Sequence, residues 1–352
     1  GNTFTDFLDC AVSIDGATTA GSKPTTFATG IEFTNNTVDN CANYTTYGTG
    51  ALWYNGTSGI VISDNIMTQT SRGSGDNGYL IKGRYNKGDL IHNNYLERIV
   101  DNQPYHFTIE LWDGEGGSQI YDNTLVGGAI DVAGYYFVKG TYSFSCDVYR
   151  NVMRLNNTNT LNTTDYPTWA IVVEGGAEDV IVRQNLMQNF NYPIGISVLQ
   201  PATVMNRVTF YANVVWNWGN SATNHGAAVL VGADPDNGTM RNIGFYNNTF
   251  YDDGASFDPP YVIWFNATGG TFEDWRFENN ICIGGSTFFF RTQANSGTPT
   301  FDTLIIRNNI QYGNGYSNEP YYDASFTPYR PNYTYSGAIK SDPIFNSLAD
   351  FR

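Results

Sequence analysis

The stretch RFENNICIGG, residues 276–285, places two adjacent asparagines inside a run that is otherwise apolar and aromatic. Asparagine is a poor strand former, so its presence in such a strand-like run needs a physical reason. Similar pairs occur at 93–94, 247–248 and 308–309, again between aliphatic or aromatic residues. The recurrence indicates that the chain is built from a repeated unit.

An asparagine that follows a short alternating apolar triplet recurs along almost the whole chain, at intervals of 28 to 34 residues. These positions are Asn2, Asn36, Asn65, Asn94, Asn123, Asn151, Asn185, Asn213, Asn247, Asn279 and Asn308. A second apolar run lies upstream of each asparagine, as in YLIKG (79–83) and TIELWDG (108–114). Each repeat therefore offers two or three short strands separated by turns, and no amphipathic helix pattern is visible.

This pattern resembles the right-handed parallel β-helices of the pectin-lyase-like superfamily and its secreted β-helix repeat relatives. The resemblance covers about residues 1–312 and implies an all-β, single-stranded right-handed parallel β-helix of about 10–11 coils. Stacked coils bury one continuous core, so we expect one domain, to which the Tyr/Pro-rich segment 313–352 also belongs. Asparagine tolerates the left-handed turn conformation, and its amide can bond to the next coil, so the repeated asparagines are predicted to form a structural ladder.

The composition restricts the partners of the chain. Its formal net charge is −15, and it has no basic run that could neutralise phosphates, which argues against a nucleic-acid partner. No apolar run approaches the roughly 18 residues that a membrane span needs. Nine N-x-T sequons permit N-glycosylation and favour an extracellular, secreted or cell-surface location. They are Asn35, Asn43, Asn55, Asn156, Asn162, Asn237, Asn247, Asn266 and Asn332.

The cysteines lack the C-x-x-C spacing of a zinc or thioredoxin-type site. Cys10 and Cys41 fall on adjacent coils, a few residues after Asn2 and Asn36, and adjacent coils bring equivalent Cα atoms near the range of a disulfide. We therefore predict a Cys10–Cys41 bridge. Cys146 and Cys282 are expected to be small buried apolar residues.

The catalytic patterns of related β-helix enzymes are absent: YDDG (251–254) and NHG (224–226) reverse the order found in polygalacturonases. A charged stripe remains, because Lys82, Glu110, Lys139 and Glu174 occupy similar places in four consecutive repeats. One interpretation is a solvated row of salt bridges. The other is a glycan site in which a lysine is the base and a glutamate the acid.

Other side chains could contact a glycan or an ion. Asp113 and Glu115 could bind Ca²⁺ with neighbouring carbonyls, or could be solvated acids in a turn. Aromatic side chains can stack on sugar rings, or can fill the core and coat the outer face of a β-helix. The candidates for stacking are Tyr54, Trp112, Trp216 and Trp218.

Two functions follow from these patterns. The first is an extracellular scaffold segment of a larger surface, adhesive or fibre-forming protein, glycosylated and in contact with glycans or with further copies of itself end to end or side by side. The second is an enzyme that degrades or modifies an acidic polysaccharide as a lyase, epimerase or glycoside hydrolase. No cofactor is required by either function, apart from the Ca²⁺ considered above.

Overall fold

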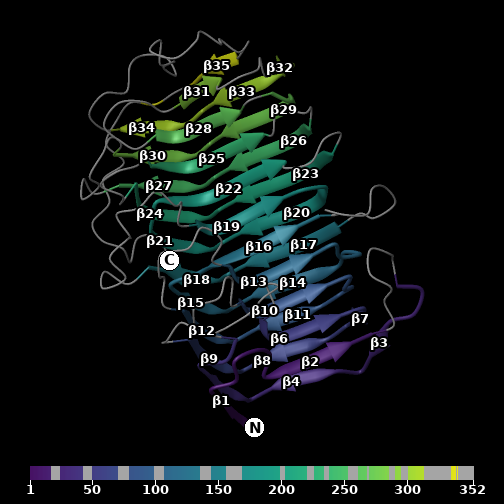
Figure 1. The fold of residues 1–352 in the computed structure, drawn as a ribbon. Coiled ribbons are helices and arrows are strands. Elements are labelled where there is room, and N and C mark those ends of the chain that lie inside the picture. Colours follow the sequence, from purple (N-terminus) through teal and green to yellow (C-terminus); the bar gives the residue numbers. More distant parts are fainter. Residues whose placement is uncertain are drawn as a thin grey trace.

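Every described element of the computed structural model is a β-strand, and the strands stack into one elongated body (Figure 1). The described residues therefore include no helix that is long and apolar enough to cross a membrane. The structure describes residues 1–16, 24–42, 50–69, 79–98, 107–134, 144–155, 169–198, 203–219, 226–233, 238–252, 261–267, 269–284, 290–294, 300–312, 334–337 and 339.

Three long sheets contain almost all of the strands. Sheet 1 has eleven strands: β1 (Thr3–Thr5), β5 (Thr37–Asp39), β9 (Ile66–Gln69), β12 (Tyr95–Arg98), β15 (Thr124–Val126), β18 (Val152–Arg154), β21 (Leu186–Phe190), β24 (Val214–Trp218), β27 (Thr249–Tyr251), β30 (Ile281–Ile283) and β34 (Ile310–Tyr312). Sheet 2 has ten: β2 (Val12–Asp15), β6 (Gly50–Asn55), β10 (Tyr79–Arg84), β13 (Phe107–Trp112), β16 (Ala129–Ala133), β19 (Trp169–Glu174), β22 (Tyr192–Val198), β25 (Ala227–Ala233), β28 (Tyr261–Ala267) and β31 (Phe290–Ala294).

Sheet 3 has twelve strands, eleven of them along its main path and one, β32 (Thr300–Phe301), paired at the side of β29. The main path consists of β4 (Glu32–Thr34), β8 (Val61–Ser63), β11 (Leu90–His92), β14 (Ser118–Tyr121), β17 (Phe144–Tyr149), β20 (Ala177–Arg183), β23 (Val204–Tyr211), β26 (Thr239–Tyr246), β29 (Thr271–Glu278), β33 (Leu304–Arg307) and β35 (Thr334–Ser336). A short additional sheet pairs β3 (Ala28–Thr29) with β7 (Thr57–Ser58).

The chain visits the three sheets in turn and then starts the next coil. Each strand pairs in parallel with its counterpart one coil away, as β10 does with β6 and β13. This arrangement confirms the predicted all-β parallel solenoid. Sheet 3 continues to β35, so at least one strand of the solenoid lies beyond residue 312, where the predicted coils end.

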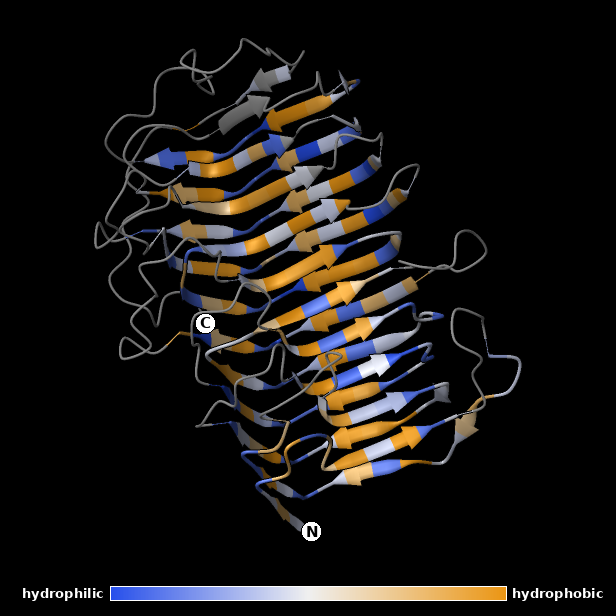
Figure 2. Cartoon of the chain, in the orientation of Figure 1, coloured by the Kyte–Doolittle hydropathy of each residue, from blue (hydrophilic) through white to orange (hydrophobic). Residues whose placement is uncertain are grey.

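Side chains alternate between the core and the outer surface, and apolar and polar residues accordingly alternate along many strands (Figure 2). One continuous apolar core runs through all of the coils. Equivalent core residues stack on one another between coils, and the rings of Phe210 and Phe245 lie 4.6 Å apart. The core is thus formed by stacking and not within any single coil.

The repeated asparagines form a buried hydrogen-bonded ladder at the turn that leads into sheet 1. Oδ1 of Asn94 accepts two hydrogen bonds from Asn65, one from its backbone N–H at 3.1 Å and one from its side-chain Nδ2 at 2.9 Å. Its own Nδ2 donates to Oδ1 of Asn123 at 2.9 Å and to the carbonyl of Ile62 at 2.9 Å. Each amide therefore also bonds the backbone of the neighbouring coil, which an apolar side chain could not do.

The last three predicted ladder positions are wrong by one residue. Asn248, Asn280 and Asn309 form the ladder there, whereas Asn247, Asn279 and Asn308 were predicted. The remaining members are Asn2, Asn36, Asn65, Asn94, Asn123, Asn151, Asn185 and Asn213.

The residue directly before each ladder asparagine from Asn36 onward has a positive φ. These residues are Asn35, Asp64, Asn93, Asp122, Arg150, Gln184, Ala212, Asn247, Asn279 and Asn308. In each Asn-Asn pair the first residue makes the left-handed turn, for which asparagine is well suited, and the second residue enters the ladder. The two asparagines of RFENNICIGG therefore have different structural roles.

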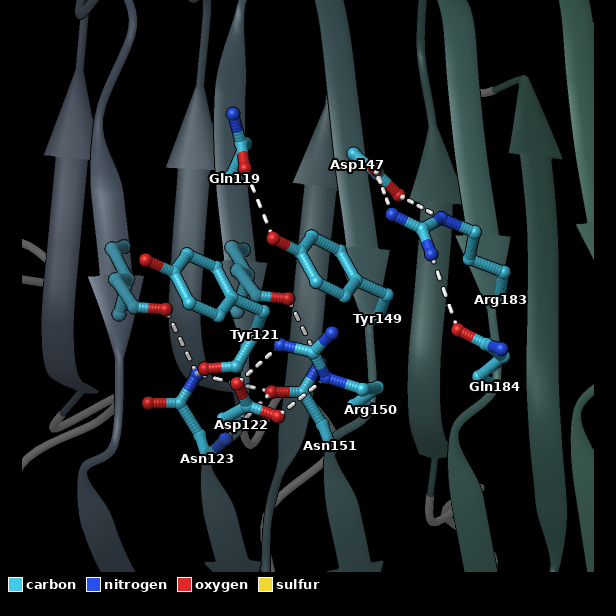
Figure 3. A network of polar contacts seen from close by, with 12 residues as sticks. Gln119, Tyr121, Asp122, Asn123, Asp147, Tyr149, Arg150, Asn151, Arg183 and Gln184 are labelled. Carbon is cyan, nitrogen blue, oxygen red and sulfur yellow. Dashed lines mark hydrogen bonds and ion pairs between the residues drawn. The ribbon is translucent and has the colours of Figure 1, made fainter.

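Next to the ladder, the outward face of sheet 3 carries a network of rings and ion pairs (Figure 3). The ring of Tyr121 stacks on Tyr149 with centroids 4.9 Å apart, and the Arg183 guanidinium covers Tyr149 at 4.1 Å. Arg150 binds both carboxylate oxygens of Asp122 on the adjacent coil. These pairs are partly exposed, so each adds little to stability by itself, but together they hold neighbouring coils in register.

The predicted disulfide is not formed, and none of the four cysteines belongs to a disulfide. The thiol of the buried Cys41 donates to the carbonyl of Asp39, whereas the thiol of the half-buried Cys10 lies 3.6 Å from the carboxylate of Asp9. The prediction failed because the two residues are not equivalent within their coils. Cys10 follows its ladder asparagine by 8 residues and Cys41 by 5.

Candidate active site

A row of charged residues crosses four coils of sheet 2. Lys82 on β10 is the direct partner of Glu110 on β13, and Glu110 is the direct partner of Asp131 on β16. Glu174 on β19 is the direct partner of Ala133, so it lies two residues further along its strand than the position opposite Asp131. We call Lys82, Glu110, Asp131 and Glu174 the acidic cluster.

The predicted stripe is therefore partly reproduced. The structure brings Lys82 and Glu110 together, but Asp131 occupies the third position of the row, where Lys139 was predicted. Lys139 itself lies outside the described residues. Glu174 belongs to the cluster although its register differs by two residues from that of the other three members.

The members of the cluster point away from the core but are buried. Ile81, Ile109 and Ile130 alternate with them along the strands and belong to the continuous core. The exposed fraction of the residue is nevertheless only 6% for Lys82, 3% for Glu110, 0% for Asp131 and 9% for Glu174. Burial of this kind excludes the interpretation of the row as a solvated surface stripe, because ionised groups are costly to bury.

Lys82 is held by one carboxylate and several aromatic rings. Its Nζ lies 2.5 Å from Oε2 of Glu110. The same ammonium lies 4.0 Å from the ring centroid of Tyr79 and 5.3 Å from that of Trp112. Cation–π contacts and a close carboxylate both favour the charged ammonium, so they offset the cost of its burial.

Asp131 has little compensation, because the charge of Lys82 lowers its pKa by less than burial and the two glutamates raise it. Neither of its carboxyl oxygens has a hydrogen-bond partner among the described residues. Burial raises the pKa of Asp131 well above its ordinary value, and the charges of Glu174 and Glu110 raise it further. Asp131 is therefore the member of the cluster best suited to carry a proton at neutral pH.

The two glutamates differ in their surroundings. Burial raises the pKa of Glu110, while Lys82 and the Tyr79 hydroxyl act in the opposite direction. Burial raises the pKa of Glu174 to about 7, and the charge of Glu110 adds to that effect. The cluster thus holds an ion-paired carboxylate beside a carboxyl group that retains its proton, which is the arrangement that general acid–base chemistry needs.

Arg84 and Asp113 border the cluster. The guanidinium of Arg84 lies 3.3 Å from Oδ2 of Asp113 and 5.6 Å from the ring centroid of Trp112. Asp113, predicted to bind Ca²⁺ with Glu115, is therefore committed to an ion pair. The described residues contain no group of three His, Cys, Asp or Glu side chains that could hold a metal ion, and the Ca²⁺ site stays a prediction.

An aromatic patch continues the same outward face along the next coils. It consists of Trp169, Tyr192, Leu230, Tyr261 and Trp264, on strands β19, β22, β25 and β28. The rings of Trp169 and Tyr192 lie 5.3 Å apart, and those of Tyr261 and Trp264 lie 6.1 Å apart. Trp169 and Trp264 are half-buried, and Trp169 packs over Gly195, which has no side chain to displace it.

Two of the four residues predicted to stack on sugars are in the core. Tyr54 is completely buried and donates to Asp89 at 2.9 Å, and Trp218 is completely buried and donates to the carbonyl of Tyr261 at 3.0 Å. Both predictions are wrong, because a strand position shifted by one residue points to the opposite face. Trp112 does lie at the acidic cluster, and Trp216 is half-buried beside Tyr251, 4.4 Å away, on sheet 1.

The sequons fall in different surroundings. Asn35 and Asn247 are exposed residues at the left-handed turns, and Asn55 and Asn266 are half-buried at the ends of strands of sheet 2. The other predicted acceptors lie outside the described residues, and they are Asn43, Asn156, Asn162, Asn237 and Asn332.

Sequence reasoning placed Asp131 near the charged stripe but not in it, and did not assign the aromatic patch to the site. A usable signal existed for Asp131, because Ile81, Ile109 and Ile130 each directly precede a charged residue in their strands. The patch carried no comparable signal, since alternate aromatic residues occur on both faces of a β-helix.

No protein-family model matches the sequence, and no curated protein matches it either.

Proposed function

We propose that this chain is an extracellular carbohydrate-active enzyme that hydrolyses glycosidic bonds on the outward face of sheet 2. The observation that carries the proposal is the directly opposed pair of Glu110 and Asp131, two buried carboxyl groups in different electrostatic surroundings. Glycoside hydrolysis needs one carboxyl group that keeps its proton and one that is ionised, and unequal environments produce that difference.

The surroundings suggest a role for each group. Asp131, which forms no ion pair among the described residues, donates its proton to the glycosidic oxygen as the bond to the anomeric carbon breaks. Glu110, ion-paired with Lys82, attacks that carbon as its carboxylate and forms an ester to the sugar. Water then adds its oxygen to the anomeric carbon, gives a proton back to Asp131, and releases Glu110 as a carboxylate.

The proposed substrate is a polysaccharide, and the proposed location is outside the cell. The aromatic patch supports the first point, because tyrosine and tryptophan rings stack on sugars. The sequons support the second, with Asn35 and Asn247 exposed for glycosylation.

The test is release of new reducing ends from a panel of neutral, amino, uronic and sulfated polysaccharides. We expect the wild-type chain to release reducing ends from at least one of them, and Asp131→Asn and Glu110→Gln to abolish the release while remaining folded. Undiminished cleavage by both variants, or no cleavage of any glycan, would contradict the proposal.

A scaffold segment of a larger surface, adhesive or fibre-forming protein is the second candidate. The unbroken asparagine ladder from Asn2 to Asn309 favours it, because such regularity suits a stiff spacer that associates with glycans or with its own copies. Light scattering and negative-stain electron microscopy test this candidate. A monomer that cleaves glycans would exclude self-assembly as the main role.

A further inference from the structure

The basic side chains around the acidic cluster are already paired with acids. Lys82 is bound to Glu110, and Arg84 is bound to Asp113. Asp131 and Glu174 remain without a basic partner among the described residues, so the described site has two basic and four acidic side chains. An incoming acid group would meet no unpaired cation here and would have to compete with a carboxylate of the protein.

Acidic residues still outnumber basic residues when the sequence of the connecting segments is counted as well. The stretches of sequence 70–78, 99–106, 135–143 and 156–168 precede strands β10, β13, β17 and β19. Together they contain two basic residues, Arg72 and Lys139, and three acidic residues, Asp76, Asp101 and Asp165.

Asp131 is suited to an uncharged polar ligand. Its two carboxyl oxygens are fully buried and have no partner among the described residues. A protonated carboxyl group both donates and accepts, which matches a sugar hydroxyl. A uronate or sulfate at the same place would bring two anionic groups together out of bulk water, where their repulsion is strong.

The three strands that follow the acidic cluster are also free of charged residues, and the next charged residue of sheet 2 is Arg291 on β31, opposite Trp264. Strands β22, β25 and β28 contain no charged residue along their whole length. Their outward side chains include Tyr192, Leu230, Tyr261 and Trp264, together with Gly195 and Gly232. Aromatic rings of this kind bind the apolar faces of sugar rings and offer no counter-charge to a uronic acid.

We infer that the glycan recognised by this face of sheet 2 carries no acidic groups, and is built from neutral or amino sugars. The inference rests on the proposed function, since it specifies the substrate of the same site. It reverses the acidic substrate expected from the sequence resemblance, because the two cations at the acidic cluster, Lys82 and Arg84, are already engaged by carboxylates of the protein.

Affinity electrophoresis of the intact chain tests the inference. The gels contain mixed-linkage β-glucan, xylan, glucomannan, glycol chitosan, alginate or polygalacturonate. We expect retardation by at least one neutral or amino glycan and none by alginate or polygalacturonate. Retardation by a neutral glycan should be unchanged by a roughly tenfold increase in salt, since no ion pair to the ligand is involved.

Variants locate the binding to the aromatic patch. Trp264→Ala should weaken retardation about tenfold, and Trp264→Phe should restore most of it. Trp216→Ala is the matched control, because Trp216 is also half-buried but lies on sheet 1, and it should leave binding unchanged. Equal loss with Trp216→Ala would overturn the assignment to this face.

The outcomes separate this inference from the proposed function. Binding of a neutral or amino glycan without any cleavage supports the inference and contradicts the enzymatic proposal. Binding of alginate or polygalacturonate overturns the inference. Cleavage of either glycan also overturns the inference but leaves the enzymatic proposal in place. A chain that binds no glycan contradicts both.

Discussion

Asp131 lies directly opposite Glu110 on the neighbouring strand, and both side chains are almost completely buried although they point away from the core. Within the described part of the chain, Glu110 forms an ion pair with Lys82 and Asp131 forms none. Two carboxyl groups on directly opposed residues of adjacent strands cannot both ionise without cost. The one next to the lysine therefore ionises, and the other keeps its proton.

Removing the proton donor or the nucleophile should abolish cleavage. We expect Asp131→Asn and Glu110→Gln each to lower kcat by a factor on the order of 10² to 10⁴, because the amides cannot exchange the required proton or attack the sugar. Asp147→Asn is the control, since Asp147 pairs with Arg183 on sheet 3 and is remote from the cluster. Steady-state kinetics with thermal unfolding curves separates lost chemistry from lost folding. A kcat close to wild type for either cluster variant would refute the assigned role.

The spacing of the pair predicts the stereochemistry of the reaction. Adjacent parallel strands lie about 4.8 Å apart, so directly opposed outward carboxyl groups lie near the ~5 Å separation of retaining glycosidases. Inverting enzymes need a wider gap that holds a water molecule. We therefore expect the first product to keep the anomeric configuration of the substrate, as measured by proton NMR during early turnover. An inverted product would place the nucleophilic water between Asp131 and another acid, such as Glu174.

Stability should decrease as pH rises towards neutral. The pKa of Glu174 is raised to about 7, first by burial and then by the charge of Glu110. Between its ordinary pKa and pH 7 the folded state binds a proton that the unfolded state has lost, so the free energy of unfolding falls with rising pH. The contribution is complete below the ordinary pKa and disappears above about pH 7, and it is at most about 3 kcal/mol.

Urea unfolding at mildly acidic and mildly alkaline pH measures this effect. Glu174→Gln should reduce the difference between the two conditions, whereas Ser197→Ala, which changes the uncharged partner of Glu174 on β22, should not. Some pH dependence should remain in Glu174→Gln, because burial also raises the pKa of Asp89 to about 7. The same pH dependence in both variants would show that Glu174 does not retain its proton.

The sequence predicted the solenoid well because its determinants are local and repeated. A ladder asparagine and an apolar triplet recur in every coil, so an error in one repeat does not affect the others. The three misplaced ladder positions all lie in Asn-Asn pairs, where either residue fits the apolar pattern. Only backbone conformation distinguishes Asn279, with φ of 58°, from Asn280, which is in the ladder.

The site was harder to predict because the segments before sheet 2 vary in length. The cluster residue follows its ladder asparagine by 17 residues for Lys82, by 16 for Glu110 and by only 8 for Asp131. The segment YFVKG, 136–140, resembles YLIKG and so suggested Lys139, but the strand of that coil is β16 at Ala129–Ala133. Two apolar runs competed for one strand position, and periodicity alone does not decide between them.

The Asn279–Asn280 pair allows a matched test of the ladder. Oδ1 of Asn280 accepts bonds from the backbone N–H and the Nδ2 of Asn248, and its Nδ2 donates to Asn309 and to the carbonyl of Phe245. Asn280→Ala should lower the free energy of unfolding by about 2–4 kcal/mol, because it leaves buried backbone and amide groups without partners. Asn279→Gly should cost under about 1 kcal/mol, since Asn279 is exposed and glycine adopts its positive φ freely. Urea unfolding of the two variants measures the difference. Equal losses would mean that the ladder bonds contribute nothing beyond the turn, and that the apolar stacking of coils alone holds the register.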